Sequence, residues 1–242
     1  MKICVIIPVY NSENLIADVL KSVLQYTKDV IVVNDGSTDK TSFILQEFSE
    51  ITLVSYEKNR GKGYALQSGF RKAIELGFTH ATTMDADGQH LATDIVTLEQ
   101  TAKEHPTALI VGARKFTDPN MPQGNIFANK FSNFWFTVQT WKCLADTQTG
   151  FRVYPLQKIG KMHIFTKRYE AELEILVRSA WRNTPIISQP INVYYPPKEE
   201  RLSHFRGGKD FFRISVLNTI LCICAVIYGY PSMLLRKLWN RK

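Results

Sequence analysis

The sequence predicts an α/β fold with a doubly wound, mostly parallel, Rossmann-like sheet and an apolar helix near the C-terminal end. Short β-rich apolar runs alternate with stretches of helical period, which is typical of a parallel sheet covered by helices on both faces. The 242 residues are 45% hydrophobic and 21% charged, as in a single globular domain. The 22 residues 214–235 carry no charge. We therefore expect a catalytic domain at residues 1–200 and a membrane-associating tail at residues 201–242.

The individual elements follow from these patterns in order along the chain. Strands are expected where a short β-rich run is closed by turn residues, at residues 2–9, 29–34, 52–56, 81–85, 108–112 and 190–195. Helices are expected where apolar residues recur at helical spacing, at residues 14–25, 63–76, 123–138 and 169–181, with one more that ends at residue 48 and is capped by Thr38 or Asp39. Ligands of such a sheet bind outside the carboxyl ends of its strands. The residues that follow each strand are therefore the first candidates for a site.

Most of the net charge of +8 belongs to the tail. Residues 198–242 contain nine Lys or Arg and three Asp or Glu, which accounts for +6 of the total. These cations flank the apolar stretch 214–235, an arrangement that fits anionic lipid head groups better than a nucleic acid. We expect a membrane surface as a partner and no nucleic acid.

As one helix, residues 214–235 extend about 33 Å, close to the thickness of a bilayer core of about 30 Å. Pro231 would kink or end that helix, and basic residues flank it on both sides, so a single crossing would place one cluster on the disfavoured side. We expect an in-plane or re-entrant anchor rather than a true span, and a buried core helix is the remaining alternative. The four cysteines show no metal-ligand spacing, and the N-terminus has no signal-peptide pattern. These features favour the cytoplasmic face of a membrane.

The sequence DADGQH at residues 85–90 is the sharpest motif. It follows an apolar strand, and its two carboxylates, Asp85 and Asp87, are hard oxygen ligands suited to Mg²⁺ or Mn²⁺. A metal held there neutralises the phosphates of a leaving nucleotide. An Asp-x-Asp pair alone is weak evidence, because many Asp residues near strand ends only cap turns, but the strand before it and the Gly after it strengthen the interpretation.

Polar residues also follow the first three expected strands. Pro8, Tyr10 and Glu13 leave the first strand, and Asp35 and Asp39 leave the second. Acids and an aromatic ring at this edge can hold a base and a ribose, although turn formation alone explains most of residues 36–38. The sequence NRGKG at residues 59–63 opens a helix, where free N–H groups and cations such as Lys62 can meet phosphate. Taken alone, this stretch is equally consistent with a helix entry and solvated charges.

Four motifs in order resemble one family. IPVYN at residues 7–11, VVNDGSTD at 32–39, NRGKGYAL at 59–66 and DADGQH at 85–90 are similar to family-2 inverting glycosyltransferases of the GT-A fold. The resemblance covers about residues 2–200 and is closest to the polyprenyl-phosphate branch that includes dolichyl-phosphate mannose synthase. It implies that Asp85, Asp87 and Gln89 ligate the metal. It also implies that the nucleotide pocket is lined by Pro8, Tyr10, Glu13, Asp35, as the acid that reads the base, and Asp39.

Residues 146–152, DTQTGFR, resemble a stretch of the same branch, with Thr149 where Ser is usual. The resemblance implies that Arg152 faces the phosphate of the acceptor, a role that suits the bidentate guanidinium; a surface ion pair is the alternative. A later Gly-x-Ser-Lys element of the branch has only a partial analogue here, at residues 203–209.

The implied reaction is an inverting transfer of a sugar from a GDP- or UDP-linked donor, with Asp87, Asp146 and Arg152 as candidate catalytic residues. The expected acceptor is a polyprenyl phosphate, whose oxygen is already anionic. If the acceptor is instead a hydroxyl of a glycolipid or a surface polysaccharide precursor, a general base is needed, and Asp146 or Glu172 are the candidates. A nucleotidyltransferase is disfavoured, because residues 10–14 are not a glycine-rich basic loop. A catalytically inactive membrane scaffold is the non-enzyme alternative, against which the intact acids argue.

Overall fold

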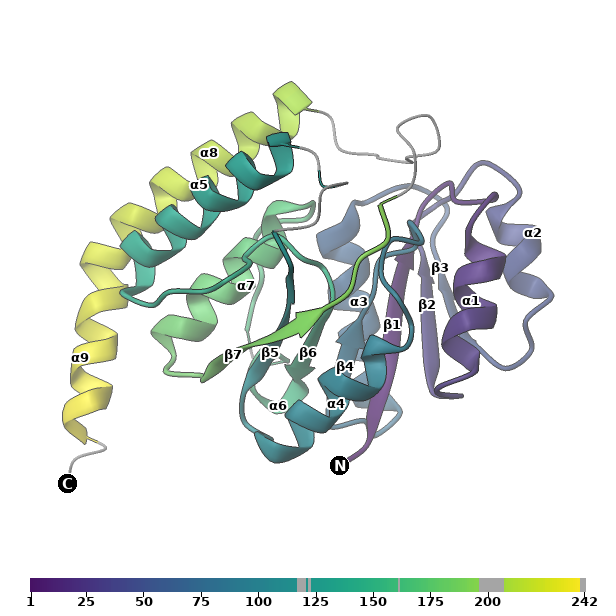
Figure 1. Cartoon of the computed structure of the whole chain (residues 1–242), viewed down its shortest axis with the longest axis horizontal. Helices are drawn as coiled ribbons and strands as arrows, with labels where there is room; N and C mark the ends of the chain where they lie inside the picture. The colour runs from purple at the N-terminus through teal and green to yellow at the C-terminus, as the bar shows by residue number, and fades with distance from the viewer. Residues whose placement is uncertain (117–120, 122, 161, 196–206, 240–242) are drawn as a thin grey trace.

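A computed structural model of the chain describes residues 1–116, 121, 123–160, 162–195 and 207–239. One seven-stranded sheet runs through the molecule in the order β3-β2-β1-β4-β6-β5-β7 (Figure 1). The strands are β1 Ile3–Val9, β2 Val30–Asn34, β3 Thr52–Ser55, β4 His80–Thr83, β5 Leu109–Arg114, β6 Arg152–Pro155 and β7 Ile186–Ile191. Strands β1 to β4 pair in parallel, as do β5 and β7, whereas β6 is antiparallel to both of its neighbours. The expected mostly parallel α/β sheet is confirmed.

Helices cover both faces of this sheet. Residues alternate in β1, so Val5 and Ile7 belong to one core cluster and Cys4 and Ile6 to the other. The first cluster packs against α1 Ile16–Leu24, α2 Thr41–Gln46 and α4 Asp94–Glu104. The second packs against α3 Lys62–Glu75, α5 Gln123–Thr140, α6 Leu156–Ile159 and α7 Glu170–Trp181. Burial on both faces explains why the first strands are continuous apolar runs.

The sequence did not indicate three elements, and it misplaced a fourth. Helices α4 and α6 and strand β6 were not expected, and the last strand, β7, begins four residues before the expected start at residue 190. Strand β6 begins with a buried Arg152 and ends at Pro155, so it has no apolar alternation to mark it. Its antiparallel pairing with β4 and β5 positions the preceding residues, 146–151, at the carboxyl edge of the parallel strands.

The C-terminal segment forms three consecutive helical pieces, α8 Gly207–Cys224, a π-helical turn Ala225–Gly229 and α9 Tyr230–Trp239. Pro231 lies in the first turn of α9, directly after the π turn, so the change in helical pitch accommodates it. Residues Phe212–Leu238 are long and apolar enough to cross a membrane by length and composition, and 28% of the most apolar window is buried. The helix packs on α5 and α7 (Figure 1). The expected domain boundary near residue 200 lies outside the described residues.

Candidate functional site

The loops after β1 and β2 are joined to each other by reciprocal hydrogen bonds. The amide of Glu13 donates to Asp39 (3.1 Å), and the amide of Lys40 donates back to the Glu13 carboxylate (2.8 Å). Asn11, at a positive φ of 47°, accepts from the Thr38 amide (2.8 Å). Burial opposes the charge on Asp39, but its hydrogen bonds outweigh this and lower its pKa. Glu13 and Asp39 therefore hold the loops after β1 and β2 together. Pro8 and Tyr10, at the end of β1, are half-buried.

Asp35 fixes the entry of α3. Its two carboxylate oxygens accept hydrogen bonds from the amides of Arg60 (2.8 Å) and Gly61 (2.7 Å), and the side chain is buried. Burial raises the pKa of Asp35 despite these two bonds. Gly61 has a φ of 98° and lies against the main chain of Lys167, which leaves no room for a Cβ. Both oxygens of the acid expected to read the base are thus engaged with the neighbouring loop.

Lys62 lies at the centre of the edge and joins two carboxylates from distant parts of the chain. Its ammonium is 2.6 Å from Asp85, after β4, and 2.9 Å from Glu172, in the first turn of α7. Burial opposes the charge on Lys62, but the two carboxylates outweigh it and raise its pKa. A Cβ on Gly150 would lie 2.6 Å from an Asp85 oxygen and 2.9 Å from the Lys62 nitrogen. Glycine at that position allows the residues before β6 to close against the ion pair.

Asp85 and Asp87 lie on one turn, together with Gln89, and all three side chains are half-buried. Burial disfavours the charge on both acids. Lys62 overcomes this at Asp85 and lowers its pKa, whereas the charge of Asp85 adds to the burial and raises the pKa of Asp87. The amide of Gln89 donates to Asp87 (3.0 Å). Among the described residues no group of three or more His, Cys, Asp or Glu side chains converges.

This arrangement fits a divalent cation. Asp85 and Asp87 are hard oxygen donors on one turn, and a cation would offset both the burial and the repulsion from Asp85 that raise the pKa of Asp87. Mg²⁺ is commonly held by one or two carboxylates together with substrate phosphates and water. Two protein carboxylates without a third are therefore an appropriate donor set for a metal that is completed by a nucleotide diphosphate.

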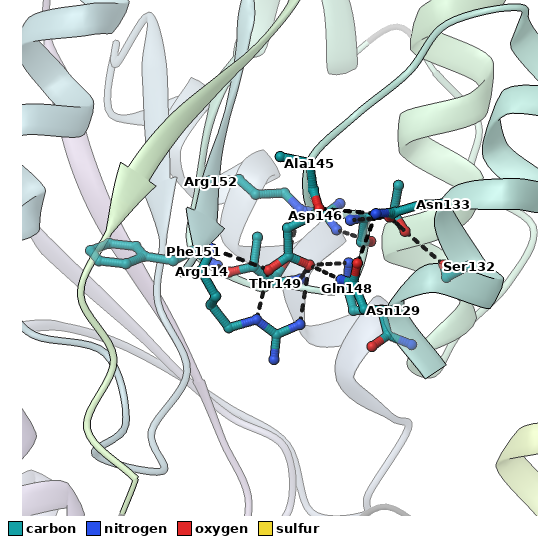
Figure 2. A network of polar contacts seen from close by, with 11 residues as sticks. Arg114, Asn129, Ser132, Asn133, Ala145, Asp146, Gln148, Thr149, Phe151 and Arg152 are labelled. Atoms are coloured by element: carbon teal, nitrogen blue, oxygen red, sulfur yellow. Dashed lines mark hydrogen bonds and ion pairs between the residues drawn. The ribbon is translucent and has the colours of Figure 1, made fainter. Parts of the chain in front are cut away.

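Asp146 lies at the centre of a buried polar network (Figure 2). The Arg114 guanidinium, at the end of β5, donates to both of its oxygens (2.6 and 3.1 Å), Asn129 of α5 donates as well (2.5 Å), and so does the amide of Gln148 (2.9 Å). Burial raises the pKa of Asp146, but these donors outweigh it and hold the pKa below its usual range. A buried carboxylate that already accepts these hydrogen bonds is poorly suited to accept a proton, so the geometry disfavours Asp146 as a general base.

Arg152 takes a different position from the one that the resemblance implied. Its side chain is 0% exposed, and its guanidinium donates to the main-chain carbonyls of Thr149 (2.7 Å), Thr147 (2.9 Å) and Glu172 (2.8 Å). It is also not a surface ion pair. Arg152 ties the turn before β6 to the start of α7, and its guanidinium is engaged by carbonyls of the protein itself.

Two pairings at this edge of the sheet are not indicated by the sequence. Arg114, which donates to Asp146, is separated from it by 32 residues and ends an apolar strand, where the sequence does not distinguish a paired cation from a solvated one. The pairing of Lys62 with Glu172 links residues 110 positions apart. Lys62 directly precedes the expected helix 63–76 and Glu172 lies in the expected helix 169–181, but nothing in the sequence joins the two.

Known proteins match most of this chain. The model of glycosyl transferase family 2 matches residues 4–157. A UDP-N-acetylglucosamine–dolichyl-phosphate N-acetylglucosaminyltransferase of Methanococcus voltae is 31% identical over 240 residues, covering 89% of this chain and 95% of the relative. The chain belongs to glycosyl transferase family 2. A dolichyl-phosphate beta-glucosyltransferase of Trichomonas vaginalis is 24% identical over 87% of this chain and 72% of its own length.

Solved structures of other proteins share the fold of this family-2 glycosyltransferase. Glucosyl-3-phosphoglycerate synthase from Mycobacterium tuberculosis, crystallised with Mn²⁺, UDP and phosphoglyceric acid, has a TM-score of 0.66 at 15% identity, covering 93% of this chain and 78% of that one. At this identity the likeness concerns the fold, and it confirms the expected GT-A architecture. The chain is an enzyme of the glycosyltransferase class, as the four motifs predicted.

Proposed function

We propose that the enzyme transfers a sugar from a UDP-linked donor to a polyprenyl phosphate at the membrane surface, with inversion at the anomeric carbon. The relative from Methanococcus voltae is named for a UDP-linked donor and a dolichyl-phosphate acceptor, and that from Trichomonas vaginalis for the same acceptor. The observation that carries the proposal is the bridge from Lys62 to Asp85 and Glu172, which brings the end of β4 and the start of α7 to one point.

Asp85 and Asp87 would hold Mg²⁺ or Mn²⁺, with Gln89 as a further oxygen donor. When bound, such a cation supplies neutralisation of the negative charge that develops on the departing diphosphate. Lys62 contributes a second positive charge at the same edge, between Asp85 and Glu172. Pro8, Tyr10, Glu13 and Asp39 form the neighbouring wall, suited to the nucleoside.

The acceptor side favours a nucleophile that needs no general base. Of the two carboxylates considered as bases, Asp146 is engaged by Arg114, Asn129 and main-chain amides, and Glu172 is paired with Lys62. A phosphate oxygen is already anionic, so catalysis reduces to orientation and charge stabilisation. Arg152 is then a positioning residue, because it holds the turn that carries Thr147 and Thr149.

The membrane location completes the proposal. Free thiols at all four cysteines agree with a reducing compartment, which favours the cytoplasmic face. The apolar segment Phe212–Leu238 supplies the association.

The deciding experiment is transfer with purified protein, Mn²⁺ or Mg²⁺, and matched panels of labelled UDP- and GDP-sugars. Each panel is offered a polyprenyl phosphate, the corresponding polyprenol, and a glycolipid with a free hydroxyl. We expect labelled lipid from a UDP-sugar with the phosphate only. Transfer to the hydroxyl acceptors alone would overturn the acceptor assignment, and transfer from GDP-sugars alone would overturn the donor assignment.

A further inference from the structure

Two helices that are far apart in the sequence share an exposed apolar surface. Helices α5 and α8 lie side by side along one flank of the molecule (Figure 1). Helix α5 exposes Phe127 (72%), Phe131 and Phe134 (58%), and α8 exposes Val216, Ile220 and Ile223. We call these six residues the α5–α8 platform. Large apolar side chains that are exposed together on two adjacent helices mark an interaction surface.

The three platform residues of α5 form one row and the three of α8 form another, and both rows point away from the sheet. On α5 the buried face carries Asn129 and Phe136, and on α8 it carries Leu217 and Leu221. With 3.6 residues per turn, the exposed rows fall opposite these buried faces. Gln139 of α5 donates to Asn218 of α8 (2.9 Å), which fixes the sides on which the two helices meet. Their outward faces therefore form one layer.

The C-terminal helix is also fastened further along its length. Gly229 packs against the Trp181 indole, where a Cβ would lie 2.5 Å from the ring nitrogen. The Tyr230 ring stacks on Trp141 at 4.0 Å, and its hydroxyl donates to the carbonyl of Val138. A helical segment fastened to the catalytic domain at residue 218 and again at residues 229–230 cannot cross a bilayer without carrying α5 and α7 into it.

The charges of the two helices indicate what covers the platform. Helix α5 contains no Asp or Glu, and the segment from α8 to the last residue contains one, Asp210 in the first turn of α8. Among the side chains whose exposure the structure describes, the exposed charged residues are Lys130 on α5, Arg213 on α8, and Arg236 and Lys237 on α9, all of them basic. An apolar face whose neighbouring charges are mainly cationic complements an anionic lipid leaflet.

We propose that the α5–α8 platform lies in the plane of an anionic bilayer, with the aromatic row of α5 inserted beside the C-terminal helix. The inference rests on the proposed function and deepens it. The inner face of α5 binds the acceptor-side turn, because Asn129 donates to Asp146 and Asn133 donates to the Ala145 carbonyl (2.9 Å) (Figure 2). One helix thus contacts lipid on its outside and holds the acceptor turn on its inside, which sets the turn about one helix diameter, some 10 Å, from the lipid.

The test measures binding to sealed phosphatidylcholine vesicles, with and without phosphatidylglycerol, by co-sedimentation of the full chain. The vesicles contain neither polyprenyl phosphate nor donor, so the result is independent of sugar transfer. Two double variants, Phe127→Gln with Phe134→Gln and Ile220→Gln with Ile223→Gln, probe the two helices. Phe43→Gln is the matched control, since Phe43 is 71% exposed on α2 at the other end of the molecule.

We expect each double variant to weaken binding about tenfold or more, because each removes two large apolar side chains from the lipid, and Phe43→Gln to bind like the wild type. Added salt should weaken the binding to anionic vesicles. If the α5 double variant binds like the wild type while the α8 double variant does not, the tail alone is the anchor and the platform is refuted. If neither variant changes vesicle binding, but both dissociate a dimer in lipid-free solution, the platform is a protein interface.

Discussion

The two halves of the sheet edge use charge differently. In the donor half, after β1 to β4, Asp85 and Asp87 are half-buried acids at an accessible edge. In the acceptor half, around β5, β6 and α5, Asp146 and Arg152 are completely buried and hydrogen-bonded to the protein itself. We infer that Asp87, and Asp85 despite its pairing with Lys62, are accessible to a ligand, whereas Asp146 and Arg152 stabilise a turn.

The largest expected effect tests the donor half. Asp87→Ala should lower kcat by about 10³-fold, because electrostatic stabilisation of a developing charge is commonly worth about 10²–10³. Its stability without metal should be unchanged or slightly higher, since burial and Asp85 raise the pKa of Asp87 and so disfavour its charge at neutral pH. Activity assays measure the effect on kcat, and thermal unfolding of the metal-free protein measures the effect on stability. Activity close to that of the wild type would contradict the metal role.

In the acceptor half, a substitution should lower the stability of the protein first, whereas Asp87→Ala lowers activity. Asp146→Asn leaves the Arg114 guanidinium without its carboxylate and should destabilise the protein by about 3 kcal/mol, the range for breaking a buried pair. The measurement is denaturant unfolding, with the Arg114→Met, Asp146→Leu double variant as the control that removes both charges. A stable but inactive Asp146→Asn enzyme would instead support direct participation of Asp146 in the chemistry.

The same variant has a predicted pH dependence. Because the pKa of Asp146 is lowered, its contribution to stability is present above the ordinary Asp value of about 3.9 and is lost as the pH falls through the lowered pKa. The stability difference between the wild type and Asp146→Asn should therefore shrink only below about pH 4. A difference that already disappears near neutral pH would contradict the assigned pairing.

The donor half was also the half that the sequence predicted well. Strands β1 to β4 are short runs closed by turn residues, and parallel strands align their carboxyl ends at one edge. Hydrogen bonds join residues 11–13 to residues 38–40, and residues 85–89 follow the neighbouring strand β4. The sequence did not indicate which partner each of these side chains binds. Asp35 and Asp39 bind loop amides in the structure.

The acceptor half depends on contacts between distant residues, which local patterns do not reveal. Strand β6 lacks apolar alternation, and its antiparallel pairing to β4 depends on residues about 70 positions away. Motif resemblance located residues 146–152 but assigned Arg152 an exposed role, because a motif identifies residues and not their burial. Helix α5 was expected, yet its second use as an exposed aromatic row beside α8 is visible only in three dimensions.

Lys62 connects the two halves, and its removal should have an intermediate effect. Lys62→Met leaves Asp85 and Glu172 without their shared cation, and it removes the positive charge that we propose lies near the donor diphosphate. We expect kcat/KM for the donor to fall about 10²-fold. Binding of UDP, measured by calorimetry without turnover, should weaken as well. Glu172→Gln is the matched control, since it keeps Lys62 next to Asp85 and should cost less than about tenfold. If Glu172→Gln is the more damaging change, Glu172 acts on the acceptor directly.

The smallest expected effect distinguishes loop support from base recognition at Asp35. An Asn at this position can accept only one of the two amide hydrogen bonds from Arg60 and Gly61, so stability should fall by about 1 kcal/mol. The loop that carries Lys62 then loosens, and binding of UDP and GDP should weaken together. Calorimetry with both nucleotides, alongside thermal unfolding, checks this. A changed preference between UDP and GDP at unaltered stability would show instead that the Asp35 carboxylate contacts the base when donor is bound.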